Sequence, residues 1–160
     1  MRVLIDTNVL CADYYLRGTS ARLLLDAGKR KYLQILVPVV VFREAVRRFR
    51  EETSGVVKDM GSWRNKLSRV APDLRFFENA RVSLGAQAND YEAYLRRVLE
   101  ISNAIFLDFP EVSHEQILNR MLARKKPMKA GGKGYQDTLI WETVLAQQPS
   151  DDSPNPLHNK

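Results

Sequence analysis

The sequence predicts an α/β fold: an open parallel sheet flanked by helices, with a largely helical middle. Two short apolar runs typical of buried strands, residues 2–5 and 32–37, alternate with segments whose apolar side chains recur at helical spacing. The length of 160 residues and the hydrophobic fraction of 44% suit one globular domain, expected over residues 1–147. Several prolines and few apolar residues predict a disordered tail over residues 148–160.

Three helices are expected in the first half of the chain. Thr19 or Ser20 can cap the first, because their hydroxyls accept hydrogen bonds from the free amides of a first turn. Pro38 fits the first turn of the second, where its missing amide is not needed. Ser54-Gly55 separates the second from the third. The expected helices cover residues 21–29, 38–53 and 56–70.

The second half is expected to be helical apart from a short apolar segment at residues 105–109 and an unreadable stretch at residues 72–88. Ser113 and Gln116 have the spacing of a capping box, in which each side chain bonds the backbone amide of the other residue. The expected helices cover residues 89–102, 114–125 and 135–146, and a loop rich in Lys and Gly covers residues 126–134.

Several classes of protein are excluded by composition. No apolar run approaches the roughly 20 residues that span a bilayer, so no membrane partner is expected. The N-terminus has one Arg and a very short apolar run before Asp6, unlike a secretory signal. The single cysteine, Cys11, excludes an internal disulfide and favours a reducing compartment. We therefore expect a cytoplasmic location.

The net charge of +6 favours a polyanionic partner such as nucleic acid. The basic residues gather in two clusters, each of which taken alone is more typical of a solvated face or a loop. Both clusters lie close in sequence to an acidic residue that could act in catalysis, which favours phosphate contact. The clusters are Arg43, Arg47, Arg48 and Arg50, and Arg120, Arg124, Lys125, Lys126, Lys129 and Lys133.

Asp6 is the first of three acidic residues that could bind a metal. It directly follows the first strand, and ligands in open α/β sheets bind just outside the carboxyl ends of the strands. The hydroxyl of Thr7 and the amide of Asn8 are placed to hold its carboxylate. The alternative is an ordinary turn, in which Asp, Thr and Asn side chains bond nearby backbone groups.

Glu44 and Asp137 are the other two acids. Glu44 lies on the first turns of the helix after the second strand, again near the carboxyl end of a strand. The alternative is a surface Glu paired with Arg47 or Arg48 at helical spacing, which contributes only ~0.3–0.5 kcal/mol. Asp137 follows glycines at a helix start, where backbone can approach a ligand closely. The helix dipole alone also favours a carboxylate there.

Carboxylates of this kind suit phosphodiester hydrolysis, which needs an activated water and neutralised charge on the phosphoryl group; one or two Mg²⁺ ions supply both. Hard oxygen ligands select Mg²⁺ or Mn²⁺ over zinc. A zinc site is disfavoured because Cys11, His114 and His158 lack the spacing of zinc ligands.

Three segments, in order, resemble the PIN-domain nucleases. LIDTNVL at residues 4–10 resembles the opening strand of that family, and VVVFRE at residues 39–44 resembles its second acidic position. KGYQDTLIWE at residues 133–142 resembles its third, as found in a larger branch of uncharacterised bacterial PIN proteins. The resemblance covers residues 1–146, with the helical middle less distinctive.

The resemblance implies a PIN-like parallel-sheet fold and cleavage of RNA or single-stranded nucleic acid with Mg²⁺ or Mn²⁺, a toxin-like role included. Asp6, Glu44 and Asp137 would be the catalytic metal ligands, and should converge around metals about 3.5–4 Å apart. Thr7, Asn8 and Thr138 would support them. The residues that would bind nucleic acid are Arg43, Arg47, Arg124, Lys125, Lys126, Lys129 and Lys133.

The C-terminus departs from the family pattern. PIN domains normally continue after the last helix into another strand, a loop with a fourth acid, and usually a further strand. Residues 147–160 have no strand pattern, so we expect these strands to be missing, and Asp151 and Asp152 do not replace the fourth acid. A homo-oligomer or a protein partner is expected to cover the exposed sheet edge. The alternatives to a nuclease are therefore a catalytically impaired nucleic-acid-binding domain and a protein-interaction domain.

The basic loop gives a testable prediction. Changing Arg124, Lys125, Lys126, Lys129 and Lys133 to Ala should weaken RNA binding about equally for all RNA sequences. The slope of log affinity against log salt should flatten by about 0.7 for each phosphate that the protein no longer neutralises. A titration that finds both affinity and slope unchanged would assign the loop to solubility alone.

Overall fold

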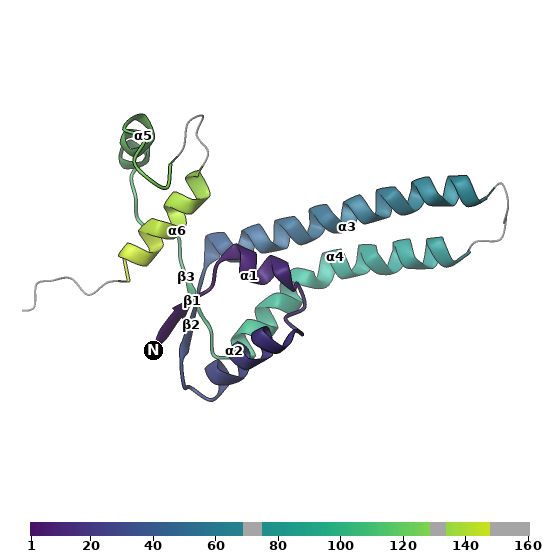
Figure 1. The fold of residues 1–160 in the computed structure, drawn as a ribbon, viewed down its shortest axis with the longest axis horizontal. Coiled ribbons are helices and arrows are strands. Elements are labelled where there is room, and N and C mark those ends of the chain that lie inside the picture. Colours follow the sequence, from purple (N-terminus) through teal and green to yellow (C-terminus); the bar gives the residue numbers. More distant parts are fainter. Residues whose placement is uncertain (69–74, 129–133, 148–160) are drawn as a thin grey trace, which may run out of the picture. The chain divides into compact units, whose positions relative to one another are not determined.

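The computed structural model describes residues 1–68, 75–128 and 134–147. The chain forms two compact units, Met1–Leu107 and Asp108–Lys160. The expected disordered tail at residues 148–160 lies outside the described residues. The first unit contains β1 (Arg2–Leu4), α1 (Thr7–Ala12), α2 (Thr19–Lys29), β2 (Gln34–Pro38), α3 (Val39–Leu67), α4 (Arg75–Ile101) and β3 (Ile105–Leu107). The second contains α5 (His114–Leu122) and α6 (Tyr135–Leu145) (Figure 1).

The three strands form a parallel sheet in the order β1-β2-β3, which confirms the predicted fold class. Val3 pairs with Ile35, and Leu36 pairs with Ile105. Parallel neighbours need long crossover connections. The segment that contains α1 and α2 makes the first connection, and the α3–α4 pair makes the second. All three strands therefore end at the same edge of the sheet, and α1 and α3 both begin there.

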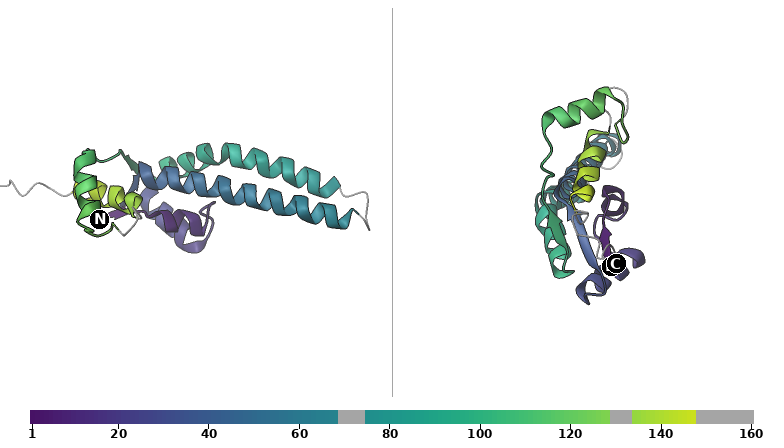
Figure 2. Two further views of the ribbon diagram at one scale, coloured as in Figure 1. Left: turned by 90° about the horizontal axis from the view of Figure 1, so that it is seen from above. Right: turned by 90° about the vertical axis from the view of Figure 1, so that its left-hand side faces the viewer.

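The two long helices α3 and α4 lie side by side (Figures 1 and 2). The predicted break at Ser54-Gly55 is wrong, because α3 continues through both residues to Leu67. Gly55 is exposed with open space where a side chain would project, so its cost is the ~1 kcal/mol of helix propensity alone. Ion pairs Arg50–Glu92 and Arg64–Glu78 join the two helices at 3.2 and 3.7 Å.

The stretch that shows no pattern in the sequence is mostly helix, because α4 begins at Arg75 rather than near Asn89. The outer half of α4 exposes large apolar side chains, including Phe76 and Val82. A helix whose apolar residues are not confined to one buried face gives a weak periodic signal. Residues 69–74, between the two helices, lie outside the described residues.

A cluster of aromatic rings attaches the loop after α1 to the paired helices. Phe49 of α3 stacks on Tyr91 of α4 at 3.9 Å between ring centroids, and Tyr14 meets both rings edge-on. The Tyr91 hydroxyl donates to the backbone carbonyl of Tyr14 at 3.0 Å, and the Tyr94 hydroxyl donates to that of Tyr15 at 2.8 Å. Burial raises the pKa of Tyr91 above its ordinary value, so its phenol stays neutral and can donate. These bonds hold the loop after α1 against α4.

In the second unit, the predicted capping box is confirmed: Ser113 Oγ accepts from the Gln116 amide at 3.1 Å, and Gln116 Oε1 accepts from the Ser113 amide at 3.0 Å. An ion pair between Arg120 and Glu142 joins α5 to α6 at 2.7 Å. Gly134, at the N-terminus of α6, has a φ of +96°, a conformation that favours glycine. Among the described helices, none combines the length and the apolar character that crossing a bilayer requires.

Alanine substitutions at two glycines should change the free energy of unfolding in opposite directions. A Cβ on Gly28 would lie 2.5 Å from the carbonyl oxygen of Ser102 and 2.7 Å from Ile35 Cδ1, so Gly28→Ala should lower the free energy of unfolding by about 1–3 kcal/mol. Gly55→Ala should raise it by about 0.5–1 kcal/mol, because alanine is the better helix former at an open site. Urea denaturation measures both changes, and destabilisation by Gly55→Ala would contradict a continuous α3.

Candidate metal centre at the sheet edge

Asp6 is positioned by the residues that follow it. It lies two residues beyond β1 and is the N-cap of α1. Its Oδ1 accepts a hydrogen bond from the backbone amide of Thr7 at 2.7 Å, and its Oδ2 accepts one from Asn8 Nδ2 at 3.2 Å. Asp6 is exposed, whereas Thr7 is buried. The alternative to a metal ligand at Asp6 is an ordinary turn, but the structure has the first turn of a helix there. In the sequence, this helix is indicated by a capping Asp that precedes the apolar pair Val9-Leu10.

Glu44 is almost buried, with 6% of its surface exposed, and it is held by arginines. Its Oε1 accepts hydrogen bonds from Arg47 Nη2 at 2.7 Å and from Arg48 Nε at 2.8 Å, and its Oε2 accepts one from Arg47 Nε at 2.9 Å. Hydrogen bonds to Glu44 raise the pKa of both guanidinium groups above their ordinary values. The sequence offers ion pairs of Glu44 with Arg47 or Arg48 as the alternative to metal binding, and the structure contains both pairs. Glu44 is nevertheless almost buried, unlike the surface Glu of that alternative.

The helix that begins at Asp6 packs against the helix that carries Glu44. Cys11 of α1 lies within electrostatic range of Glu44, Arg48 and Glu52. Burial raises the pKa of the Cys11 thiol above its ordinary value, with opposing contributions from Tyr14 and Arg48 that lower it. The same face of α3 therefore holds Glu44 and lies next to α1, at the sheet edge where Asp6 emerges.

Asp137 and Thr138 belong to the second unit. Asp137 is exposed in the first turn of α6. Thr138 is fully buried, and its Oγ1 donates to the carbonyl of Gly134 at 2.9 Å, which fixes the start of the helix. Convergence of Asp137 with Asp6 and Glu44 remains a prediction. Within residues 1–68, 75–128 and 134–147, no three acidic, His or Cys side chains group closely enough to hold a metal ion.

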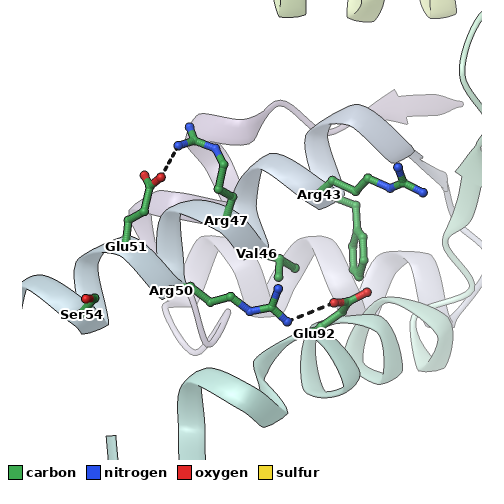
Figure 3. A pocket seen from close by; sticks show the side chains of 8 residues that line it. Arg43, Val46, Arg47, Arg50, Glu51, Ser54 and Glu92 are labelled. Atoms are coloured by element: carbon green, nitrogen blue, oxygen red, sulfur yellow. Dashed lines mark hydrogen bonds and ion pairs between the residues drawn. The ribbon is translucent and has the colours of Figure 1, made fainter. Parts of the chain in front are cut away.

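Three arginines of α3 line a cleft of about 570 Å³ beside α4 (Figure 3). Two of them, Arg43 and Arg47, are predicted from the sequence to bind nucleic acid, and Arg50 lines the same cleft. Arg47 pairs with Glu51, and Arg50 pairs with Glu92 (Figure 3). Arg50 is not among the residues that the sequence assigns to nucleic-acid binding, although its spacing of seven from Arg43 places both on one face of the helix.

The other predicted phosphate-binding residues lie in the second unit or outside the described residues. Arg124, Lys125 and Lys126 are exposed just after α5. Lys129 and Lys133 lie outside the described residues.

The donor chemistry fits a hard divalent cation. The carboxylates and the neighbouring amide of Asn8 supply the oxygen ligands that Mg²⁺ and Mn²⁺ prefer, and Asp6 presents an exposed carboxylate at the ligand-binding edge of a parallel sheet. Glu44, by contrast, has both oxygens engaged by guanidinium groups. A metal at this edge would need Arg47 or Arg48 to move partly away from Glu44.

The parallel sheet and its helices define an α/β domain with an exposed carboxylate at the carboxyl edge of the sheet. The model of the PIN domain family matches residues 3–151, nearly the whole chain. The chain therefore belongs to the PIN-domain family, and membership implies nucleic-acid binding. No curated protein and no solved structure gives a significant match.

The capping role of Asp6 can be tested separately from any catalytic role. Asp6→Ala removes the N-cap of α1 and should lower the free energy of unfolding by about 1 kcal/mol. Asp6→Asn should change it far less, because Asn caps a helix as well as Asp does. Chemical denaturation followed by circular dichroism measures both, and equal stability of the two variants would rule out the cap.

Proposed function

We propose that this protein is a divalent-metal-dependent ribonuclease that hydrolyses phosphodiester bonds of RNA or single-stranded nucleic acid. The observation that carries the proposal is the exposed Asp6, held by Thr7 and Asn8 at the carboxyl edge of the sheet in a PIN-domain chain. In this proposal Asp6, Glu44 and Asp137 hold Mg²⁺ or Mn²⁺. The bound ion would make the attacking water more acidic and neutralise charge on the phosphoryl group.

The chain's own residues would orient the carboxylates and the substrate. Asn8 and the amide of Thr7 fix both oxygens of Asp6, which spares the site a rearrangement when a cation arrives. Thr138 holds the first turn of α6 on which Asp137 lies. Arg43 and Arg47 would bind the phosphate backbone, so binding should tolerate many sequences and weaken with salt. A toxin-like role with a protein partner is compatible with such an activity.

A second function, nucleic-acid binding without efficient cleavage, is favoured by two observations. Glu44 is engaged by Arg47 and Arg48, and no three metal-binding side chains group together in the described part of the chain. A domain in this state would bind RNA through its arginines and show little turnover. Protein interaction through the sheet edge is a third candidate, distinguished by absence of RNA affinity.

Cleavage of single-stranded RNA by purified protein tests the proposal. With Mg²⁺ or Mn²⁺ the wild type should cleave, EDTA should stop cleavage, and Asp6→Asn should slow it by at least about a hundredfold, because metal stabilisation of a transition state amounts to several kcal/mol. Asp59→Asn, a matched change at an exposed acid of α3, should leave the rate unchanged.

Equal cleavage by the wild type and Asp6→Asn would point to a contaminating nuclease and reject the proposal. RNA binding by the wild type without metal-dependent turnover would select the binding domain instead.

A further inference from the structure

The contact between Glu44 and its two arginines is unusual for a residue expected to bind metal. A carboxylate can accept about four hydrogen bonds. Three are supplied here by guanidinium groups, two from Arg47 and one from Arg48. The chain's own cations therefore already neutralise this carboxylate.

Exposure differs sharply between the carboxylate and the arginines. Glu44 is 6% exposed, whereas the side chains of Arg47 and Arg48 are 53% and 43% exposed. An almost buried carboxylate needs a counter-charge, and removing it without replacement is costly. The arginine head groups, by contrast, reach solvent and can move to another anion. The guanidinium fork matches phosphate as well as it matches carboxylate.

Arg47 also lines the cleft between α3 and α4. Arg43 and Arg50 line the same cleft. Two carboxylates line it as well: Glu51, which pairs with Arg47, and Glu92, which pairs with Arg50 (Figure 3). Arg47 is thus shared between the candidate metal ligand and the candidate phosphate site. Arg48 is not among the residues that line the cleft.

Building on the proposed function, we propose that Arg47 and Arg48 are positioning residues that hold Glu44 away from metal in the free protein. A nucleic-acid phosphate in the Arg43–Arg47–Arg50 cleft draws Arg47 off Glu44. Two of the three guanidinium hydrogen bonds to that carboxylate are then lost, including the one to Oε2, while Arg48 stays on Oε1. Metal binding and RNA binding then strengthen each other, because coupling between two sites is reciprocal. As a result, the metal centre assembles only in protein that has already bound RNA.

The first test measures Mn²⁺ affinity of RNA-free protein by calorimetry. Arg47→Gln should raise the affinity on the order of fivefold, the lower end of typical coupling between sites. Arg47→Lys should raise it by less, because lysine keeps the charge but lacks the fork. Arg81→Gln is the matched control: Arg81 pairs with Glu78 at the same i,i+3 spacing, and its removal should leave Mn²⁺ affinity unchanged.

Three results would overturn the proposal: unchanged affinity in both Arg47 variants, an equal rise in Arg81→Gln, or no Mn²⁺ binding by any variant. Circular dichroism checks that each variant is folded. If Arg47→Gln unfolds, Arg47→Lys decides, because it retains a counter-charge for Glu44 and still releases the bidentate contact.

The second test measures RNA affinity in EDTA against salt concentration. Arg47→Gln should weaken binding and flatten the salt slope by about 0.7, the value for one phosphate contact to single-stranded nucleic acid. An unchanged salt slope would contradict the proposal that Arg47 moves from the Glu44 carboxylate to an RNA phosphate. Failure here is distinct from failure of the proposed function. The inference fails when Asp6-dependent cleavage is present but Mn²⁺ affinity is indifferent to Arg47, whereas the proposed function fails when that cleavage is absent at saturating Mn²⁺.

Discussion

Parallel pairing of three short strands is the constraint on which the rest of the first unit depends. Each parallel neighbour requires the chain to return to the same starting edge, so helices must make the connections. Both connecting segments leave from the carboxyl edge of the sheet, where α1 begins at Thr7 and α3 begins at Val39. Asp6 and Glu44, far apart in sequence, are therefore carried by neighbouring helices at one edge.

That packing has an electrostatic consequence at Glu44. The carboxylate lies on the α3 face near α1 and is almost buried, a position that requires a counter-charge. Arg47 and Arg48 meet the requirement from the next turn of the same helix. Arg47 also lines the cleft beside α4. The side chain that supplies the counter-charge of Glu44 at the sheet edge is therefore also part of a surface that could bind phosphate. One helix thus serves both halves of the candidate site.

The sequence predicts features with local causes and misses those with tertiary ones. The first two strands, the capping box at Ser113 and the start of α3 after Pro38 all follow from patterns within a few residues, and the alternation of strands with helices predicts the parallel sheet. The continuation of α3 through Gly55 could not be predicted, because a Ser-Gly pair is typical of a break between helices. The burial of Glu44 likewise could not be predicted, because spacing alone does not separate a surface ion pair from a buried one.

The most direct measurement of the metal centre is an anomalous difference map from crystals soaked in Mn²⁺ together with a short single-stranded oligonucleotide. We predict a manganese peak in contact with the carboxylates of Asp6, Glu44 and Asp137, with Arg47 turned from Glu44 toward a phosphate. A map without a peak at Asp6, in crystals whose cleft holds the oligonucleotide, would contradict the assignment of this edge as a metal centre.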